Sequence, residues 1–246
     1  MPSLSICCLE TRPSHIERAA AAVIRTVAAV KVDCIYWFSN SPFPGRLPGI
    51  EIVSTRVDRA FDDFFDDVNY ICLRLIPQVV ATDFTLLVQW DGFAVNAGAW
   101  DRRFLRYDYV GACWLWMWGG GRFSRWRGPI VGNGGFSLRS RRLLDALLRI
   151  DLKWRPEEWR ADPRIERQEY FVAGANQRKY LPEDLIISLW YRKILEADFG
   201  IRFCPPRLAN KFSVESPGQF TQRWLGRSFG FHGPNAAPHY GVSLEG

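Results

Sequence analysis

The sequence has few of the residues that build metal centres, disulfide frameworks or membrane spans. It holds three His and two Met, and its six cysteines form no Cys-x-x-Cys pair. Most of these cysteines lie in apolar runs, so we expect buried, reduced thiols rather than a zinc site. No apolar run reaches the roughly eighteen residues that a transmembrane helix needs. The start, MPSLSICCLE, lacks a basic region and a small-residue cleavage site, so we expect a cytoplasmic protein without a signal peptide.

The charge and the aromatic content are high and point to an anionic partner. The formal net charge is +6, and the chain holds 11 Trp. Arginine, which greatly outnumbers lysine, suits phosphate and carboxylate groups, and tryptophan is common in carbohydrate sites and at membrane interfaces. A nucleotide, a nucleic acid, an anionic membrane or simply a basic surface all fit this balance. No recognised nucleic-acid motif occurs, so we do not expect a nucleic-acid partner.

Strand and helix signals alternate along the first part of the chain. This alternation predicts an α/β fold with a mostly parallel sheet flanked by helices. Strands are predicted at 4–9, 33–38, 50–54, 85–89, 109–113 and 130–139, and helices at 15–31, 61–76, 141–150 and 182–195. The chain from Phe203 onward is predicted to be rich in loops.

The first candidate site is the end of a predicted strand, at Gln89-Trp90-Asp91-Gly92. In open α/β sheets, ligands bind beyond the carboxyl ends of the strands. A carboxylate there suits a substrate hydroxyl or a cation bound to a diphosphate, which prefers oxygen ligands. An aspartate that caps the following segment is the simpler interpretation of the same pattern.

Two adjacent glycines, Gly134 and Gly135, interrupt the strand predicted at 130–139. Glycine weakens a strand and usually marks the close approach of a ligand or of another backbone. A β-bulge is the alternative. Ser140 is expected to cap the helix that follows.

Two further candidates lie in the second half of the chain. Glu183 and Asp184 follow Pro182 at a predicted helix start, where carboxylates often satisfy backbone donors. The functional alternative is a general base that takes the proton from an attacking sugar hydroxyl. His232 precedes Gly233 in a predicted loop. We expect it to be mobile and exposed, although a lone histidine is more often structural than a ligand.

The order of these motifs resembles a known pattern. The motifs are LETRP (9–13), QWDG (89–92), YDYVGACW (107–114), VGNGGFSLRS (131–140), PEDL (182–185) and FHG (231–233). Over roughly residues 4–235, the series resembles a family of predicted glycosyltransferases with the GT-A nucleotide-sugar fold. The order GGFS and then ED is also similar to the acceptor-side motifs of the β-1,4-galactosyltransferases. The resemblance implies one domain over 1–246, with a nucleotide-binding half at about 1–92 and an acceptor and catalytic half at about 93–235.

The resemblance also implies roles for individual residues. Asp184 would be the catalytic base, and Glu183 would hold acceptor hydroxyls. Asp91 and His232 would bind a divalent cation, Mn²⁺ or Mg²⁺, although the usual Asp-x-Asp motif is Asp91-Gly92-Phe93 here. The residues implied to border the donor are Glu10, Thr11, Arg12, Ser39, Gln89, Asp91, Gly134 and Gly135.

A Trp- and Gly-rich stretch, WLWMWGGGRFSRWRG, is predicted to be a long loop. Its residues Arg122, Arg125 and Arg127 would supply positive charge to a leaving diphosphate. The loop would also order over the donor as a lid and exclude water, whose attack on the donor competes with transfer.

We therefore predict a glycosyltransferase that moves a sugar from a nucleoside-diphosphate sugar, most simply a UDP-sugar, to a cell-surface or lipid-linked glycan. Transfer is expected to be inverting, with a carboxylate base. The basic, Trp-rich surface would suit peripheral contact with the inner face of a membrane. The alternative is a non-catalytic protein on the same fold that binds a nucleotide sugar or a carbohydrate, which the incomplete Asp-x-Asp motif favours.

Overall fold

The computed structural model describes residues 2–57, 64–114, 130–153, 182–218 and 221–244. Its centre is a six-stranded sheet in the order β3-β2-β1-β4-β9-β6. Four neighbouring strands, β3, β2, β1 and β4, run parallel, whereas β9 is antiparallel to both β4 and β6. These strands are β1 (Leu4–Leu9), β2 (Cys34–Ser39), β3 (Glu51–Arg56), β4 (Phe84–Val88), β6 (Tyr109–Val110) and β9 (Ser137–Ser140). The sequence prediction of a mostly parallel α/β sheet is confirmed.

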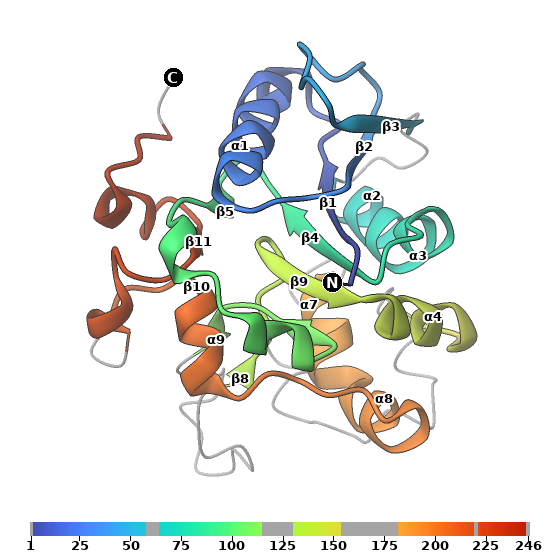
Figure 1. The fold of residues 1–246 in the computed structure, drawn as a ribbon. Helices are drawn as coiled ribbons and strands as arrows, with labels where there is room; N and C mark the ends of the chain where they lie inside the picture. The colour runs from blue at the N-terminus through green and yellow to red at the C-terminus, as the bar shows by residue number, and fades with distance from the viewer. Residues whose placement is uncertain (1, 58–63, 115–129, 154–181, 219–220, 245–246) are drawn as a thin grey trace.

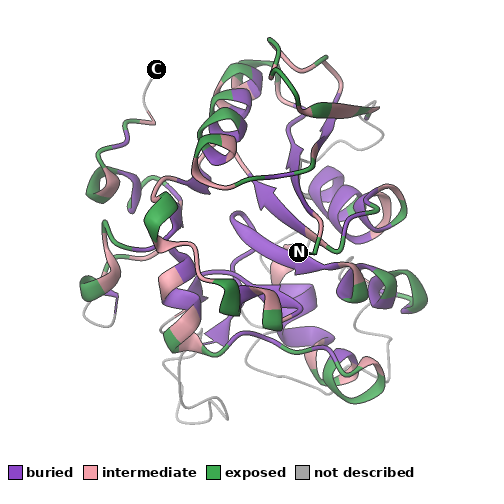
Figure 2. Cartoon of the chain, viewed as in Figure 1, coloured by how far each residue is buried: buried purple, intermediate pink, exposed green. Residues whose placement is uncertain are grey.

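Helices cover the central sheet (Figure 1). In the first half they are α1 (Ile16–Ala29), α2 (Phe64–Tyr70) and α3 (Ile76–Val79), and in the second half α4 (Arg141–Arg149), α7 (Glu183–Leu185), α8 (Arg192–Phe199) and α9 (Pro206–Phe212). The α1 helix buries its Ala19, Ala20 and Val23 face and exposes the opposite face (Figure 2). Ser140 caps α4 as predicted, since its hydroxyl accepts a 3.1 Å hydrogen bond from the Leu143 N–H.

Two smaller sheets extend the fold beyond β4. One has the order β10-β11-β5, from β10 (Ser213–Val214), β11 (Gly230–His232) and β5 (Gly92–Ala94). The other pairs β7 (Cys113–Trp114) with β8 (Ile130–Val131). Short 3₁₀ segments include η3 (Ala97–Ala99), η4 (Arg102–Arg106) and η6 (Gln222–Trp224). The β5–β11 pair matters for the site because it joins the end of β4 to the C-terminal part of the chain.

The cysteine prediction is confirmed. All six are free thiols, and only Cys34 is partly exposed. Within the described residues, no helix combines the length and the apolar character that crossing a bilayer requires.

The predicted helix at 61–76 was expected to end at Pro77, but the structure continues the helix to Val79. A π-helical turn, η2 (Ile71–Leu75), comes just before the proline. Proline lacks an N–H and clashes with the carbonyl four residues earlier in a regular α-helix. The wider π turn alters that spacing, which explains why the helix tolerates the proline.

Two other predictions about elements are wrong, and one is incomplete. The stretch predicted as one strand at 130–139 is two strands, β8 and β9, with 132–136 as a connecting loop. The region from Phe203 is rich in loops, as predicted, but it also contains α9, β10 and β11. His232 is the last residue of β11, its side chain is 17% exposed, and it is not in a loop. Strands of two or three residues and a seven-residue helix are too short to show a hydrophobic periodicity in the sequence.

Candidate active site

The loops after β1 and β2 are tied together at the carboxyl edge of the parallel strands. The Glu10 N–H donates to the Phe38 carbonyl at 3.0 Å, and the Asn40 side-chain amide donates to the Thr11 carbonyl at 2.9 Å. Ser39 ends β2, and its hydroxyl accepts a 3.1 Å hydrogen bond from the Ser41 N–H, two residues further along. The predicted donor-binding residues of the two loops therefore lie together, as the resemblance implies.

The side chains of this edge mainly hold the loops in place. Arg12 donates through Nε and Nη2 to the two oxygens of Glu10, at 2.8 and 2.7 Å. Glu10, Thr11 and Ser39 are all buried, whereas the Arg12 side chain is 33% exposed. Of the four residues, Arg12 is the one that presents a charged side chain to solvent at the edge.

Asp91 lies in a tight turn that leads from β4 into β5. Gln89 and Gly92 exchange two backbone hydrogen bonds, of 2.9 and 3.1 Å, across this turn. The Asp91 carbonyl accepts from the Gly233 N–H at 2.7 Å, which ties the turn to the end of β11. The backbone thus fixes Asp91 beside His232.

The imidazole of His232 lies between two carboxylates. Its Nε2 is 3.7 Å from Asp91 Oδ1, and its Nδ1 is 3.3 Å from Glu215 Oε1. The Asn133 side-chain amide contacts both His232 and Glu215. Its Nδ2 lies 3.0 Å from His232 Nδ1 and 2.8 Å from Glu215 Oε1. Burial acts to lower the pKa of His232, but the Glu215 hydrogen bond and the charges of Asp91 and Glu215 outweigh it and raise that pKa.

The two glycines form the contact between this histidine and the Glu183–Asp184 pair. A Cβ atom on Gly134 would overlap the Glu183 carboxylate, and one on Gly135 would overlap the His232 imidazole. The Gly134 N–H donates to Asp184 Oδ2 at 3.2 Å. The glycines therefore serve close approach, but the groups that approach are side chains of this chain.

The pKa of the Asp184 carboxyl group is strongly shifted by its surroundings. Burial, followed by the negative charges of Glu183 and Glu215, raises the pKa of Asp184 to about 7. Two backbone N–H groups, of Gly134 and Leu185, hold its oxygens in place. A positioned carboxylate with a pKa near neutrality has the properties of a general base.

Glu183 faces the interior, where it pairs with Arg139. Arg139 Nη2 donates to Glu183 Oε1 at 2.8 Å, and the two side chains are only 1% and 4% exposed. Arg139 Nε also donates to Ser137 Oγ at 3.1 Å, and its guanidinium lies 5.6 Å from the Tyr109 ring centroid. This burial does not suit the predicted role of Glu183 in holding acceptor hydroxyls.

Asp91 and His232 fit a divalent cation that is shared with a substrate. Their facing atoms, one carboxylate oxygen and one imidazole nitrogen, are 3.7 Å apart. Among the described residues, no group of three or more His, Cys, Asp or Glu could hold a metal ion. Mg²⁺ is often held by one or two carboxylates, with phosphate oxygens and water completing the coordination. Asp91 could supply one such oxygen, and His232 an imidazole nitrogen.

Sequence reasoning missed three members of the cluster. Glu215 follows a two-residue strand, and nothing local in the sequence marks it. Asn133 and Arg139 lie inside the VGNGGFSLRS motif, but no role was predicted for them. A lone arginine in a buried strand was the available signal, because a buried charge requires a partner. The predicted lid residues Arg122, Arg125 and Arg127 lie outside the described residues.

Comparison with solved structures identifies the fold of the chain. The fold is the GT-A fold of glycosyltransferases. The galactosyltransferase LgtC, solved with donor and acceptor sugar analogues, is similar at 13% identity, with a TM-score of 0.53 over 94% of this chain and 87% of that one. Mouse xyloside xylosyltransferase 1 has a TM-score of 0.53 at 10% identity, over 94% and 98% of the two chains. A glycosyltransferase involved in glycosylation of the major capsid of PBCV-1 has a TM-score of 0.50 at 10% identity, over 99% and 95%.

The chain belongs to the family described as "Protein of unknown function (DUF5672)", whose model matches residues 72–232. This range begins in the helix before β4 and ends at His232, so it contains Asp91, Asp184 and Glu215. It leaves out the loops after β1 and β2. A search of curated proteins finds no match to the chain.

Proposed function

We propose that this protein is an inverting glycosyltransferase that moves a sugar from a UDP-sugar to a hydroxyl group of a glycan. The observation that carries the proposal is Asp184, whose carboxyl has a pKa raised to about 7 and is bonded to Gly134. It belongs to the same cluster as Asp91 and His232, at the end of β4. The GT-A fold supports the donor class.

Asp184 acts as the base in this mechanism. It accepts the proton of the acceptor hydroxyl as that oxygen bonds to the anomeric carbon and the bond from that carbon to the diphosphate oxygen breaks. A base with a pKa near neutrality is ionised at working pH and still basic enough to take the proton. Attack opposite the leaving group inverts the anomeric configuration.

Glu183 and Arg139 support the base. Glu183 is buried against Arg139, so we assign it a positioning role instead of contact with the acceptor. Its negative charge is one of the causes that raise the Asp184 pKa. Arg139 keeps that charge in place, since an unpaired buried carboxylate would take up a proton.

The donor lies across the edge formed by β1, β2 and β4 in this proposal. The loops that hold Thr11 and Ser39 border the nucleotide, and Arg12 offers its exposed guanidinium to an anionic group. Asp91 and His232 would hold a divalent cation, which neutralises the charge that develops on the leaving diphosphate. Cytoplasmic location and contact with a membrane stay predictions.

The test compares Asp184→Asn with wild-type protein and with Asp145→Asn, which alters an exposed carboxylate on α4. A thermal-shift screen of UDP-sugars and other nucleoside-diphosphate sugars, with and without Mn²⁺, first identifies the donor. Transfer should then fall about 10²- to 10⁴-fold in Asp184→Asn, with donor affinity and melting temperature retained. Asp145→Asn should behave as wild type. Full activity of Asp184→Asn, or retention of anomeric configuration by NMR, would contradict the mechanism.

The alternative is a non-catalytic protein that binds a nucleotide sugar. The observation that favours it is the single carboxylate of the Asp91-Gly92-Phe93 segment, where glycosyltransferases of this fold usually carry Asp-x-Asp. Donor binding without transfer to any member of a glycan array would support this alternative, and the same assay with Asp184→Asn would then show no difference.

A further inference from the structure

An open cavity of about 600 Å³ lies outside the candidate active site. Its lining includes Asn96, just after β5, and Arg227, just before β11. Asp91 and His232 lie at the opposite ends of these two antiparallel strands. At about 3.3 Å per residue, the five steps from Asp91 to Asn96 span on the order of 15 Å. The cavity is therefore separate from the Asp184 cluster but joined to it by one pair of strands.

The lining of the cavity is positively charged. It includes Arg102, Lys211 and Arg227, against one acid, Asp101. Asp101 is already bound by Arg103, whose Nε lies 2.9 Å from Oδ2. Among the described residues, neither Lys211 nor Arg227 forms an ion pair. Guanidinium and ammonium groups that lack a protein carboxylate are available to an anionic ligand.

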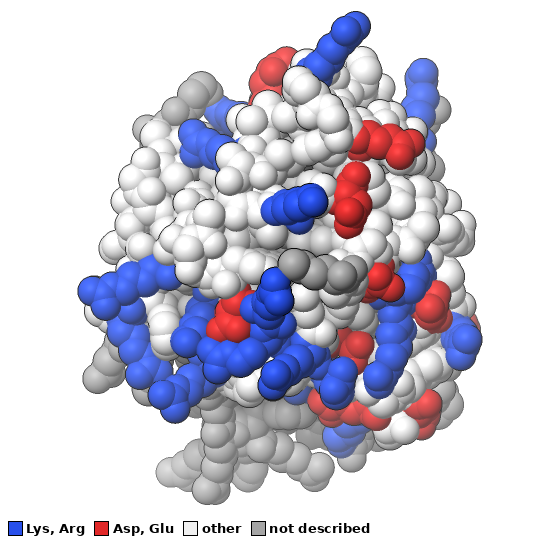
Figure 3. Space-filling model, in the orientation of Figure 1, with Lys and Arg blue, Asp and Glu red and all other residues white. Residues whose placement is uncertain are grey.

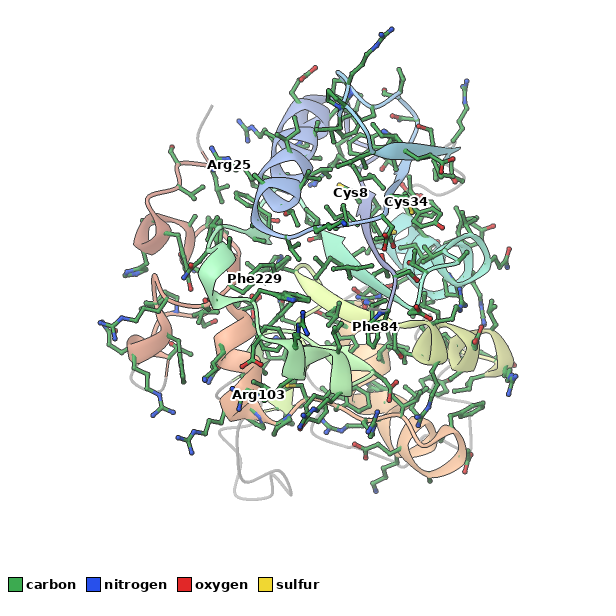
Figure 4. All side chains as sticks on the ribbon, in the orientation of Figure 1. Cys8, Arg25, Cys34, Phe84, Arg103 and Phe229 are labelled. Atoms are coloured by element: carbon green, nitrogen blue, oxygen red, sulfur yellow. The ribbon has the colours of Figure 1, made fainter. Side chains whose placement is uncertain are left out.

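The charge extends over the surrounding surface. Lys and Arg gather on the lower half of the face shown in Figure 3, the part of the molecule where η4 and α9 lie. Figure 4 labels two neighbours of the cavity in the same orientation, Arg103 on η4 and Phe229 just before β11. A ligand that approaches this face meets a positive field, which speeds the association of anions.

Two tryptophans distinguish this cavity from a simple anion site. The Trp100 ring packs edge-on against Phe229, at 5.0 Å between centroids, so its orientation is fixed. The Trp224 ring lies 5.7 Å from Lys211 Nζ and 5.0 Å from the Arg223 guanidinium. Both rings are partly exposed. The apolar surface of a partly exposed indole suits the C–H groups of a sugar ring.

We propose that this cavity binds an acidic glycan, a chain of sugars that carries carboxylate or phosphate groups. A neutral glycan would leave Lys211 and Arg227 without an anionic partner, and a free inorganic anion would make no use of the two partly exposed indoles. The further statement that this glycan is a distal part of the acceptor rests on the proposed function. Binding of the acidic glycan does not, so the two are tested separately.

The experiment measures affinity by isothermal titration calorimetry with the full chain. The probes are tetragalacturonate for carboxylates, phosphorylated mannopentaose for phosphates, neutral maltotetraose, and inorganic phosphate. The test variant is Lys211→Gln/Arg227→Gln. The matched control is Lys31→Gln/Arg149→Gln, which removes two exposed charges elsewhere on the surface. Thermal unfolding checks that both variants fold as wild type does.

At least one acidic oligosaccharide should bind wild-type protein, more weakly as salt is raised. The test variant should lose about tenfold or more in affinity, the change expected when one charge-assisted hydrogen bond is lost. The control should change less than about twofold. The two acidic probes tell whether carboxylate or phosphate is preferred.

Four outcomes would overturn the proposal. The first three are equal binding of maltotetraose, equal losses of affinity in the test and control variants, and competition by inorganic phosphate at the same concentration as the oligosaccharide. The fourth is tighter binding to vesicles that contain anionic lipid, lost in the test variant, which would assign the face to a membrane. The UDP-sugar thermal-shift screen reads out the proposed function independently of all four.

Discussion

Two regions of the candidate site are built in different ways. The first is the pair of loops after β1 and β2, which we propose to border the donor and call the donor edge. The second is the Asp184 cluster, which also contains Asp91, Glu183, Glu215 and His232. At the donor edge, Glu10 and Arg12 pair two residues apart, and backbone hydrogen bonds join the loops after two adjacent strands. In the cluster, Asp91, Glu215 and His232 come from segments far apart in the chain. The edge is fixed by bonds between neighbouring loops and within one loop, whereas the cluster depends on charged side chains from distant segments in close contact. We therefore expect substitutions to affect the cluster much more than the edge.

The largest expected effect is on stability, at the buried pair of the cluster. Arg139→Met should lower the free energy of unfolding by about 3–5 kcal/mol, because it leaves the Glu183 carboxylate buried without its partner. The double variant Arg139→Met/Glu183→Leu should recover part of that loss. Urea denaturation of the variants measures both changes. Asp145→Ala, at an exposed pair on α4, is the control and should change stability by less than about 1 kcal/mol.

A single added methyl group should break the cluster at its glycine contact. In Gly135→Ala the new Cβ overlaps the His232 imidazole, so the ring must leave its present position beside Asp91 and Glu215. We expect about 1–3 kcal/mol of destabilisation and, in the assay identified by the donor screen, about a 10²-fold loss of transfer. Gly218→Ala is matched, since its Cβ would meet nothing within 4 Å. Equal behaviour of the two variants would show that the close contact has no role.

The charge of the cluster should also appear in its pH dependence. Because the pKa of Asp184 is raised to about 7, kcat/KM should fall about tenfold per pH unit below that value as the base takes up a proton. The same shift affects folding. A carboxyl whose folded pKa lies above its unfolded value of about 3.9 contributes stability at low pH, and that contribution is lost as the pH rises through about 7.

The free energy of unfolding, measured by urea denaturation at about pH 5 and about pH 8, reports this linkage. In Asp184→Asn this free energy should depend less on pH than in the wild type. A wild-type activity profile that stays level down to about pH 5 would mean that Asp184 is not the base.

The smallest effect is expected at the donor edge. Arg12→Ala removes the bond to Glu10, yet the Arg12 backbone N–H still donates to Glu10 Oε1 at 3.0 Å. The loss should be about 1 kcal/mol, well below that of Arg139→Met, because this backbone hydrogen bond remains and the Arg12 side chain is 33% exposed, although Glu10 is buried. Donor affinity of this variant, measured by the thermal shift, separates an effect on binding from one on stability. A loss as large as that of Arg139→Met would remove the contrast between the two regions.

The same contrast explains what the sequence could predict. The strands of the parallel sheet are apolar, continuous and bounded by turns, so their positions emerged within about two residues. The residues that follow those strands lie at one edge of the sheet, which placed Asp91 at the candidate site; Glu10 and Ser39 were assigned there only from the family resemblance. Both inferences use information that is local in the chain.

The remainder of the site depends on contacts between distant segments. His232 is held in β11 through pairing with β5, and no local pattern in FHG indicates a strand. Glu183 was assigned to the acceptor from the family resemblance, and one sequence alone does not show that Arg139, 44 residues earlier, is its partner. A three-residue strand is too short for an alternating hydrophobic pattern to be detected. Which charged residues pair with each other is decided by packing rather than by local propensity.

The number of residues in the turn from Gln89 to Gly92 is constrained by the strand that follows it. In a strand, successive side chains point to opposite faces, so one inserted residue reverses the orientation of all that follow. An insertion after Asp91 would turn Phe93 away from Phe231, which it contacts at 4.9 Å between ring centroids. Among homologues, this turn should therefore vary in sequence far more readily than in length.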